Sequence, residues 1–462
     1  MPLKLWWAMV AVAVISMVFG GLALKRADKA GMRVSFGVAI IAGAIGYVFR
    51  DKSYEAASLP IYSYGVMLAL SLIVGWYLTL GLAAKANLPK DTMANCYVLT
   101  AIVALASSRL FYVATNMEQF KSIADVLAIR KGGYVAYGGF IGGFAASWLY
   151  LKSVKQEVLP WADVAVPSLA TGLTITRIGC YLFGCDFGTR LSDGAPGFLK
   201  KLGTFPHWNE KTVAVAGEGP PVWTHHRDLF QGTSKGAELL KQGHAFPVHP
   251  TQIYEAIVGV LLLVLLLVAR KSQRFKGQIF YLFAFAYGAI RFVLEIVRDD
   301  EERQPQGPAM SEHIAVPFCL VLFALAFTFG VSLGIQNLRN RMIARVVAFV
   351  PAVAMYLKLR PADYAQVIDV RFSTSQWIAL FTGLLAAYFY WKGFVDALRE
   401  EQVKAKAKKK KKKKVEEELE DEDGESELAS ETAKAADAGS PKPEGESAEA
   451  EVSKDDPKPA ES

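Results

Sequence analysis

The chain has 462 residues, of which 52% are hydrophobic, and its formal net charge at pH 7 is +7. This composition is more apolar than a single soluble core requires and excludes an ordinary soluble globular protein. The charge does not indicate a nucleic-acid partner, because Lys404–Ser462 holds 13 lysines and 18 acidic residues and the apolar part before it carries +12, as expected of a membrane protein with basic cytoplasmic loops.

Apolar runs long enough to cross about 30 Å of hydrocarbon recur along the chain. They predict an all-α polytopic membrane protein, a bundle of roughly 9–11 transmembrane helices with a small head on the outer face. The first run ends in GGLALKR without a small-x-small cleavage site, so we expect a retained helix. The predicted spans are Leu5–Leu24, Val34–Phe49, Ile61–Ala83, Tyr97–Ala114, Tyr134–Leu151, Trp161–Gly184, Ile253–Ala269, Gln278–Val297, His313–Ile335, Met342–Leu357 and Trp377–Trp391.

The charges of the connecting loops predict the orientation. Alternate loops, among them KRADKAGMR, AKANLPKD and RKSQRFK, are basic, as is the lysine run after the last span. Basic loops face the cytoplasm, so the N-terminus is expected outside and the C-terminus inside a bacterial inner membrane. The opposite set of loops contains the segment 186–250, whose length and Gly/Pro/Trp content predict a small folded head on the outer side.

Ionisable residues inside the spans are candidates for function, because burying them in lipid is costly. In AYGAIRFVLEIVRDD, Tyr287, Arg291, Glu295 and Arg298 follow one another at helical spacing, and Arg177 falls in the apolar run TGLTITRIGCYLFG. A purely structural Arg291–Glu295 ion pair is the alternative interpretation. Several arginines around one cavity suit a phosphate ester, which guanidinium groups grip with two hydrogen bonds.

Further candidates fall at the same outer level on the predicted topology. In HPTQIYEA, Pro250 suits the first turn of a helix whose N-terminal amides favour an anion, and Glu255 projects from this turn. In GGYVAYGGFIGG, Gly138 and Gly139 are spaced from Gly142 and Gly143 for close helix contact. The first turn of the HPTQIYEA helix and the glycines Gly138 and Gly139 remain candidates for close approach of a substrate. The complete outer-level set is Tyr64, Arg109, Tyr137, Arg177, His249, Glu255, Arg291 and Glu295.

The four cysteines, Cys96, Cys180, Cys185 and Cys319, are too few and too scattered to predict a disulfide framework. Cys180 and Cys185 are five residues apart, and no neighbouring CxxC or HxxxH motif supplies further metal ligands. We therefore expect neither a metal ion nor another cofactor.

The motifs YGVMLAL, SRLFYV, GGYVAYGGFIGG, RIGCYLFGCDFG, HPTQIYEA and YGAIRFVLEIVR stand in the order of the prolipoprotein diacylglyceryl transferase family, which the chain resembles over about 62–298. STSQWIAL, at 373–380, resembles the start of that family's last helix. The resemblance implies transfer of diacylglyceryl from phosphatidylglycerol to the lipobox cysteine thiol of a prolipoprotein, with glycerol phosphate as the leaving group. The implied partners are this phospholipid, the prolipoprotein signal segment and the membrane.

Individual residues match the functional positions of that family. The resemblance implies a phosphate-binding role for Arg177 and Arg291, and an orienting role for Glu295 or Glu255. The other positions that match the family's motifs are Tyr64, Gly188, Gln252 and Tyr254.

The chain also departs from the family pattern. Tyr137 replaces the usual histidine, which is the presumed base for the thiol, and Cys180 and Cys185 replace an asparagine and a glutamate. A tyrosine with a pKa near 10 is a poor base at neutral pH. The alternative bases are His249 and the head histidines His207, His225, His226 and His244.

The substitutions leave open a non-catalytic relative that binds phospholipid or lipoprotein. A transporter is a third interpretation, but it predicts polar groups that continue into the cytoplasmic half. The expected domain plan is two extra N-terminal helices (1–60), a transferase-like core with its head (61–298), inserted helices (299–372), a last transmembrane helix (373–403) and a disordered tail (404–462).

Overall fold

The computed structural model describes residues 63–120, 122, 126, 133–208, 219–299, 306–361 and 368–436, together with seven single positions before residue 44. Apart from those positions, the two predicted N-terminal spans lie outside the described residues.

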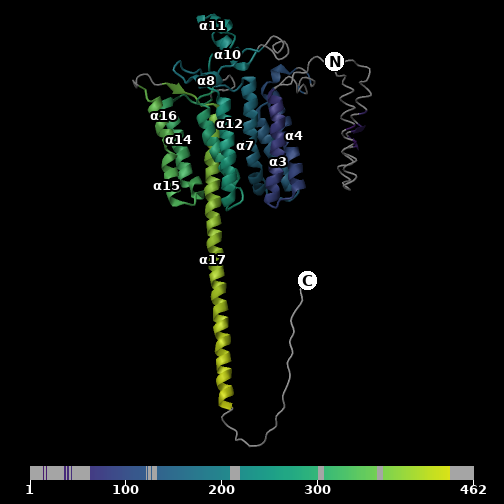
Figure 1. The fold of residues 1–462 in the computed structure, drawn as a ribbon, viewed down its shortest axis with the longest axis vertical. Helices are drawn as coiled ribbons and strands as arrows, with labels where there is room; N and C mark the ends of the chain where they lie inside the picture. Colours follow the sequence, from purple (N-terminus) through teal and green to yellow (C-terminus); the bar gives the residue numbers. More distant parts are fainter. Residues whose placement is uncertain are drawn as a thin grey trace, which may run out of the picture. The chain divides into compact units, whose positions relative to one another are not determined.

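Four helices make up the first half of the described bundle (Figure 1). They are α3 (Ser63–Lys85), α4 (Lys90–Thr115), α6 (Ala136–Ser153) and α7 (Val158–Phe183). α3 packs along α7, and α4 packs along α6. The second contact is close because a Cβ atom at Gly138 would lie 2.7 Å from the Ser107 carbonyl oxygen of α4, so only a residue without a side chain fits.

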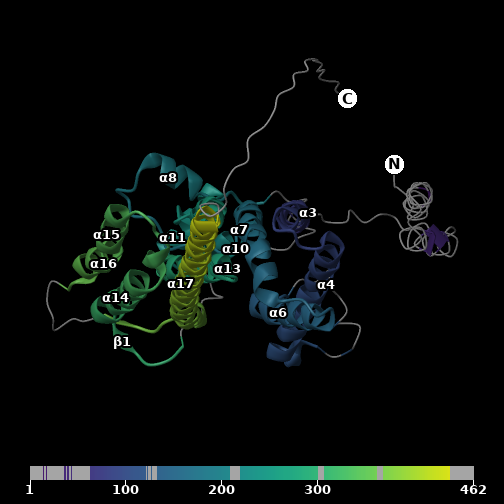
Figure 2. The same ribbon diagram turned by 90° about the horizontal axis from the view of Figure 1, so that it is seen from below.

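The second half contains α12 (Thr251–Ala269), α13 (Gln278–Leu294), α14 (Glu312–Phe329), α15 (Leu338–Val347), α16 (Val350–Leu359) and α17 (Thr374–Ala436). α12 packs on α7, and α14 packs on α16. Seen along the bundle, α7 and α13 lie between the α3–α4–α6 group and the α14–α15–α16 group (Figure 2). Seven spans of the described residues are long and apolar enough to cross a membrane, and the shorter α13 is also apolar. The prediction of an all-α polytopic membrane protein is confirmed.

The predicted span Met342–Leu357 is divided into two short helices, α15 and α16. Pro351 stands in the first turn of α16. A proline has no amide hydrogen to bond to the carbonyl of Val347, so one regular helix cannot run through this position.

Asp163 of α7 fixes the start of α13 at the end of the bundle opposite the head. Its Oδ1 accepts hydrogen bonds from the amides of Ile279 and Phe280, and its Oδ2 accepts from the amide of Gly277 and from Gln273. These amides begin a helix and have no partner within it. A buried carboxylate therefore caps α13 and sets its position against α7.

The head is a small folded unit at the other end of the bundle (Figure 1). It contains α8 (Gly197–Leu202), α10 (Pro221–Leu229) and α11 (Ser234–Gln242). Its apolar core is formed by Phe187, Phe205, Val222, Trp223, Leu239, Ala245, Phe246 and Val248. The predicted head thus has a hydrophobic core of its own.

The structure contains a short sheet that the sequence did not predict. The two-residue strands β1 (Met310–Ser311) and β2 (Asp369–Val370) pair antiparallel before α14 and α17.

The prediction of a disordered tail from Lys404 is wrong up to Ala436, because α17 continues to that residue. Alanine, lysine and glutamate dominate this stretch and all favour helix. A second compact unit, Val395–Ser462, begins within α17, and its residues 437–462 lie outside the described part.

Candidate active site

Three helix ends meet beneath the head and bring the ionisable residues together. α7 reaches this end with its C-terminus, α12 with its N-terminus and α13 with its C-terminus, because the chain crosses the bundle in alternating directions (Figure 1). Arg177, Glu255 and Arg291 are contributed by these three helices in turn. The expectation that the candidates gather at one end of the bundle is confirmed for these residues.

Arginines and carboxylates alternate along a continuous series of ion pairs. Glu255 lies between two arginines, with Oε2 2.6 Å from Arg177 Nε and Oε1 3.2 Å from Arg291 Nη1. Arg291 Nη2 is also 2.8 Å from Glu295 Oε2, one helical turn further along α13. The structural pair that the spacing suggested is therefore present, but it belongs to a larger network that spans three helices.

The network continues into the loop that follows α7. Arg177 Nη1 lies 2.6 Å from Asp186 Oδ2, and Arg298 binds the other oxygen of the same carboxylate. Burial raises the pKa of the Asp186 carboxyl, but Arg177 and Arg298 outweigh this effect and hold it well below its ordinary value. Asp186 is therefore ionised at neutral pH.

The carboxylates of the network are almost inaccessible. The side chains of Glu255 and Glu295 are each 2% exposed, whereas those of Arg177 and Arg291 are 16% and 12% exposed. The Oε2 atoms of both glutamates contact their arginines without the geometry of a hydrogen bond, and Gln252 Oε1 is also buried without a donor. Of these three buried acceptors, only Gln252 Oε1 has neither a hydrogen-bond donor nor an ion-pair partner among the described residues.

Gly188 holds the loop that carries Asp186. Its amide donates to the His249 carbonyl, and it pairs with Arg298 in an isolated bridge. A Cβ atom here would lie 2.7 Å from the Val297 carbonyl oxygen and 2.8 Å from His249 Cβ. The family-matched glycine therefore allows three segments to meet beside the network.

Tyr64 and Tyr137 reach this region from α3 and α6. The backbone of Tyr64 packs against Gly179, and its phenol is within electrostatic reach of Arg177 and Asp186. The hydroxyl of Tyr137 lies 2.7 Å from Ser375 Oγ at the start of α17.

The remaining residues of HPTQIYEA surround the start of α12. Gln252 is fully buried and donates to the Cys185 carbonyl. His249 Nδ1 is 3.2 Å from the Tyr254 hydroxyl. Burial, with a smaller contribution from Lys358, lowers the pKa of His249, so its ring is neutral at neutral pH.

Arg109 makes its hydrogen bonds to backbone carbonyls between α4 and α6. Its Nε donates to Val126 and its Nη1 donates to Gly133, while its guanidinium lies over the Phe120 ring. These contacts hold the described residues Val126 and Gly133 next to the end of α4.

The structure gives the glycines of α6 a packing role. Cβ atoms at Gly138 and Gly139 would meet the α4 carbonyls of Ser107 and Ala104, at 2.7 and 3.3 Å. The close approach that these glycines allow is therefore between two helices, not to a substrate.

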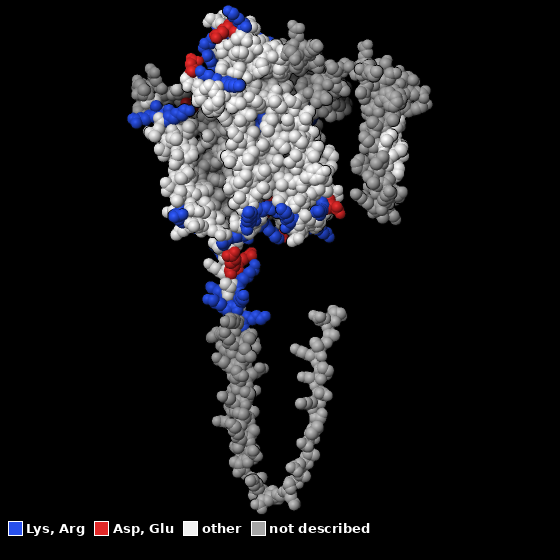
Figure 3. Space-filling view, in the orientation of Figure 1, with Lys and Arg blue, Asp and Glu red and all other residues white. Residues whose placement is uncertain are grey.

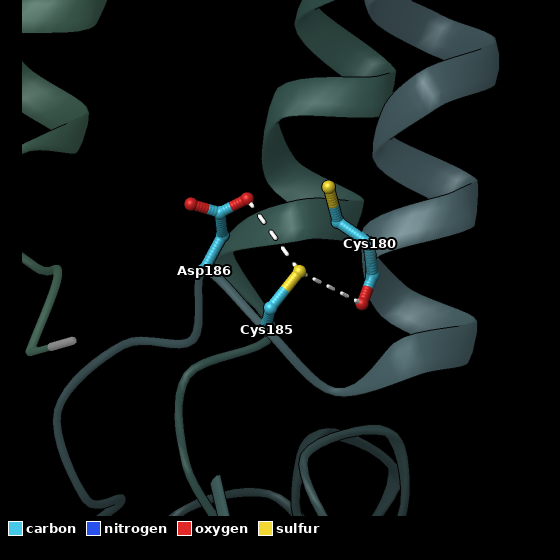
Figure 4. Close-up of side chains that lie close together, drawn as sticks. All are labelled: Cys180, Cys185 and Asp186. Atoms are coloured by element: carbon cyan, nitrogen blue, oxygen red, sulfur yellow. Dashed lines mark hydrogen bonds between the residues drawn. The ribbon is translucent and has the colours of Figure 1, made fainter. Parts of the chain in front are cut away.

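Cys180, Cys185 and Asp186 place ligand-type atoms within 4.8 Å of one another (Figure 4). Asp186 is already paired with Arg177 and Arg298. Two neighbouring guanidinium groups disfavour a cation at this position.

Sequence reasoning missed Asp186 and Ser375, and it named Tyr287 and Arg298 in one helical stripe without including them in the outer-level set. Asp186, Arg298 and Ser375 make the contacts described above, and Tyr287 lies within electrostatic reach of Glu255, Arg291 and Tyr137. The stripe Tyr287–Arg291–Glu295–Arg298 contained the signal for two of these residues, because helical spacing places them on one face.

Comparison with known proteins gives a consistent result. Residues 52–329 match the family model described as prolipoprotein diacylglyceryl transferase, a match that runs through α14 and beyond residue 298. The chain is 26% identical over 277 residues, covering 59% of this chain and 95% of the relative, to the phosphatidylglycerol–prolipoprotein diacylglyceryl transferase of Clostridium tetani. The protein of the same name from Thermus thermophilus is 29% identical over 242 residues, covering 52% and 81%.

Proposed function

The chain belongs to the prolipoprotein diacylglyceryl transferase family and is a membrane transferase that moves diacylglyceryl from phosphatidylglycerol to prolipoproteins, and on this premise we propose that the network around Glu255 is its active site. The observation that carries the proposal is that Arg177 and Arg291, from two helices, bind opposite oxygens of one buried carboxylate. Each arginine also has a carboxylate of its own, Asp186 for Arg177 and Glu295 for Arg291, and each side chain stays partly exposed.

The chemistry requires positive charge where the phosphate leaves. The thiolate of the lipobox cysteine attacks the diacylglyceryl carbon that carries the phosphate ester. A carbon–sulfur bond forms, the carbon–oxygen bond breaks, and glycerol phosphate departs with the bonding electrons. Arg177 and Arg291 stabilise the charge that develops on this phosphate, and each is partly exposed.

The acceptor oxygens of the network suit the head group of the lipid donor. Phosphatidylglycerol carries hydroxyl groups on its terminal glycerol, and each hydroxyl donates one hydrogen bond. Gln252 Oε1 has no donor among the described residues, while the Oε2 atoms of Glu255 and Glu295 are paired with Arg177 and Arg291. Donation from the glycerol hydroxyls would orient the ester for attack.

The thiol proton needs an acceptor, and two side chains are suitable. Tyr137 occupies the position of the family's usual histidine, and its hydroxyl contacts Ser375. His249 is the alternative, because burial favours its neutral ring. We favour Tyr137 on position, although a phenol is a weaker base than a neutral imidazole, since Tyr287 lies within electrostatic reach of both Tyr137 and Glu255.

The site is proposed to face the outer side of the bacterial inner membrane. Lysine and arginine gather at the bundle end opposite the head (Figure 3), where Lys85, Lys90, Lys152 and Arg270 lie in the first or last turns of helices. Basic residues favour the cytoplasmic side. We therefore propose that the head and the network lie at the surface where exported prolipoproteins emerge, with the N-terminus outside and the C-terminus inside.

Transfer by the purified full-length protein tests the proposal. The protein is incubated with phosphatidylglycerol and a peptide that carries a lipobox cysteine, and mass spectrometry searches the peptide for diacylglyceryl on sulfur. We expect the adduct with phosphatidylglycerol and no adduct when the peptide cysteine is replaced by serine. Clear binding of lipid and peptide without any adduct would instead favour a non-catalytic binding protein.

A further inference from the structure

The end of α7 brings two cysteines into side-chain contact. Gly184 adopts a left-handed conformation with φ 84°, and the amides of Gly184 and Cys185 both donate to the Cys180 carbonyl. This helix-ending pattern characteristically places the side chain after the glycine against the side chain whose carbonyl is bound. Here those two side chains are thiols.

We propose that Cys180 and Cys185 form a reversible intramolecular disulfide, which makes this helix end a site of oxidative modification. Their sulfur atoms lie within 4.8 Å of each other (Figure 4), and a disulfide bond is about 2 Å long. Cys96 and Cys319 are buried in other helices, α4 and α14. Among the described cysteines, only the α7 pair is placed for this reaction.

The surroundings distinguish the two thiols. Cys180 Sγ lies 3.8 Å from the guanidinium nitrogen Nη1 of Arg177. Cys185 Sγ lies 3.8 Å from Asp186 Oδ2, and contact with Cys180, followed by burial and Asp186, raises the pKa of Cys185. Cys180, beside a guanidinium, is assigned as the attacking sulfur, and Cys185, beside a carboxylate, as the resolving thiol.

Hydrogen peroxide is a suitable oxidant for a buried cysteine, because the molecule is small. The Cys180 thiolate attacks one peroxide oxygen and becomes a sulfenic acid as hydroxide leaves. The Cys185 thiol then gives up its proton and attacks Cys180 Sγ, which releases water. Overall, two thiols lose two hydrogen atoms, and one hydrogen peroxide becomes two waters.

Oxidation is expected to slow transfer, a consequence that rests on the function proposed above. Cys185 immediately precedes Asp186, the partner of Arg177. Drawing Cys185 towards Cys180 shifts this carboxylate and removes the Cys180 sulfur from Arg177. We expect at least a threefold lower rate, restored by dithiothreitol.

Peptide mass spectrometry tests the proposal. Trypsin cleaves after Arg177 and Arg190, so both cysteines remain in one peptide, 178–190. The full-length protein is treated with hydrogen peroxide, denatured, alkylated and digested. The proposal predicts that this peptide carries no alkyl group and is two hydrogen atoms lighter than its dithiol form. The same peptide from the reduced protein should carry two alkyl groups. Cys96 and Cys319 should be alkylated in both samples.

Cys185→Ser provides the matched variant. Without its resolving thiol, Cys180 should accumulate as a sulfenic acid that dimedone captures. Full alkylation of both cysteines after peroxide treatment would overturn the proposal, as would a stoichiometric zinc ion bound by the two thiols. A disulfide that leaves the transfer rate unchanged would overturn only its link to activity, and because the peptide mass does not depend on turnover, an inactive enzyme would not obscure the result.

Discussion

Arg177 of α7 and Glu255 of α12 are joined by a 2.6 Å contact between Nε and Oε2. The other oxygen of Glu255 lies 3.2 Å from Arg291 of α13. One carboxylate, 2% exposed, thus links the three helices that form the site. Its charge is expected to matter for stability as well as for catalysis.

Replacement of Glu255 by glutamine should destabilise the protein. The amide keeps the shape of the side chain but leaves two poorly exposed arginines without their shared counter-charge. Breaking a buried ion pair in this way costs about 3 kcal/mol. Thermal unfolding in detergent should therefore show a clearly lower midpoint.

Glu157→Gln is the matched control. Glu157 pairs with Lys276 at 2.6 Å, but both side chains are 65% exposed. An exposed pair contributes at most about 1 kcal/mol. Equal midpoint shifts for the two variants would contradict the importance assigned to the buried network.

Tyr137→Phe should slow transfer most strongly near neutral pH. The variant loses the hydroxyl that contacts Ser375, and the substrate thiol must then ionise unaided, with a pKa of about 8.5. The rate should therefore rise steeply towards pH 9. Tyr137→His, which introduces the family's usual residue, should restore neutral activity.

His249→Gln distinguishes the rival base. If Tyr137 accepts the proton, this variant should keep the pH profile of the wild-type enzyme. A profile that changes in His249→Gln and stays unchanged in Tyr137→Phe would transfer the role to His249.

The stability of the head should fall on acidification because of His226. Burial, with smaller contributions from His225 and Arg190, lowers the pKa of His226 to about 4. The unfolded chain binds a proton below about pH 6.5, whereas the folded head does not. The contribution of His226 to stability is therefore fully present above about pH 6.5. It declines as the pH falls below this value and stops declining near the folded pKa of about 4.

His226→Phe should reduce this dependence. The ring lies among Phe187, Phe230 and Phe246, so phenylalanine suits its surroundings. Thermal midpoints measured between pH 7 and pH 4 should fall less in the variant than in the wild-type protein. Parallel curves would show that another group is responsible.

The sequence was sufficient for features that depend on local periodicity. Arg291 and Glu295 are four residues apart on a helix, and their pairing followed from that spacing. Helix direction followed from counting spans, so Arg177 and Glu255 were correctly expected at the same end. Their direct contact was not predictable, because the whole head separates α7 from α12 in the chain.

Loop conformation and packing account for the features that were missed. Asp186 reaches Arg177 and Arg298 only because the chain turns at Gly184 and Gly188 fits between two backbones. No local pattern specifies which carbonyl faces a glycine, so Gly138 was a candidate for both packing and substrate contact. The helical continuation of α17 to Ala436 was not expected, because dense charge is typical of disordered segments, although alanine, lysine and glutamate also favour helix.

The transfer rate of Arg291→Ala tests the central claim most directly. The rate is measured with phosphatidylglycerol and a lipobox peptide after membrane insertion has been verified, and Arg345→Ala serves as control because Arg345 bonds to Ser332 outside the network. Loss of one preorganised charge at the leaving phosphate should lower the rate by about 100-fold or more, with Arg345→Ala close to wild type. Wild-type activity in correctly inserted Arg291→Ala would contradict the assignment of this network as the active site.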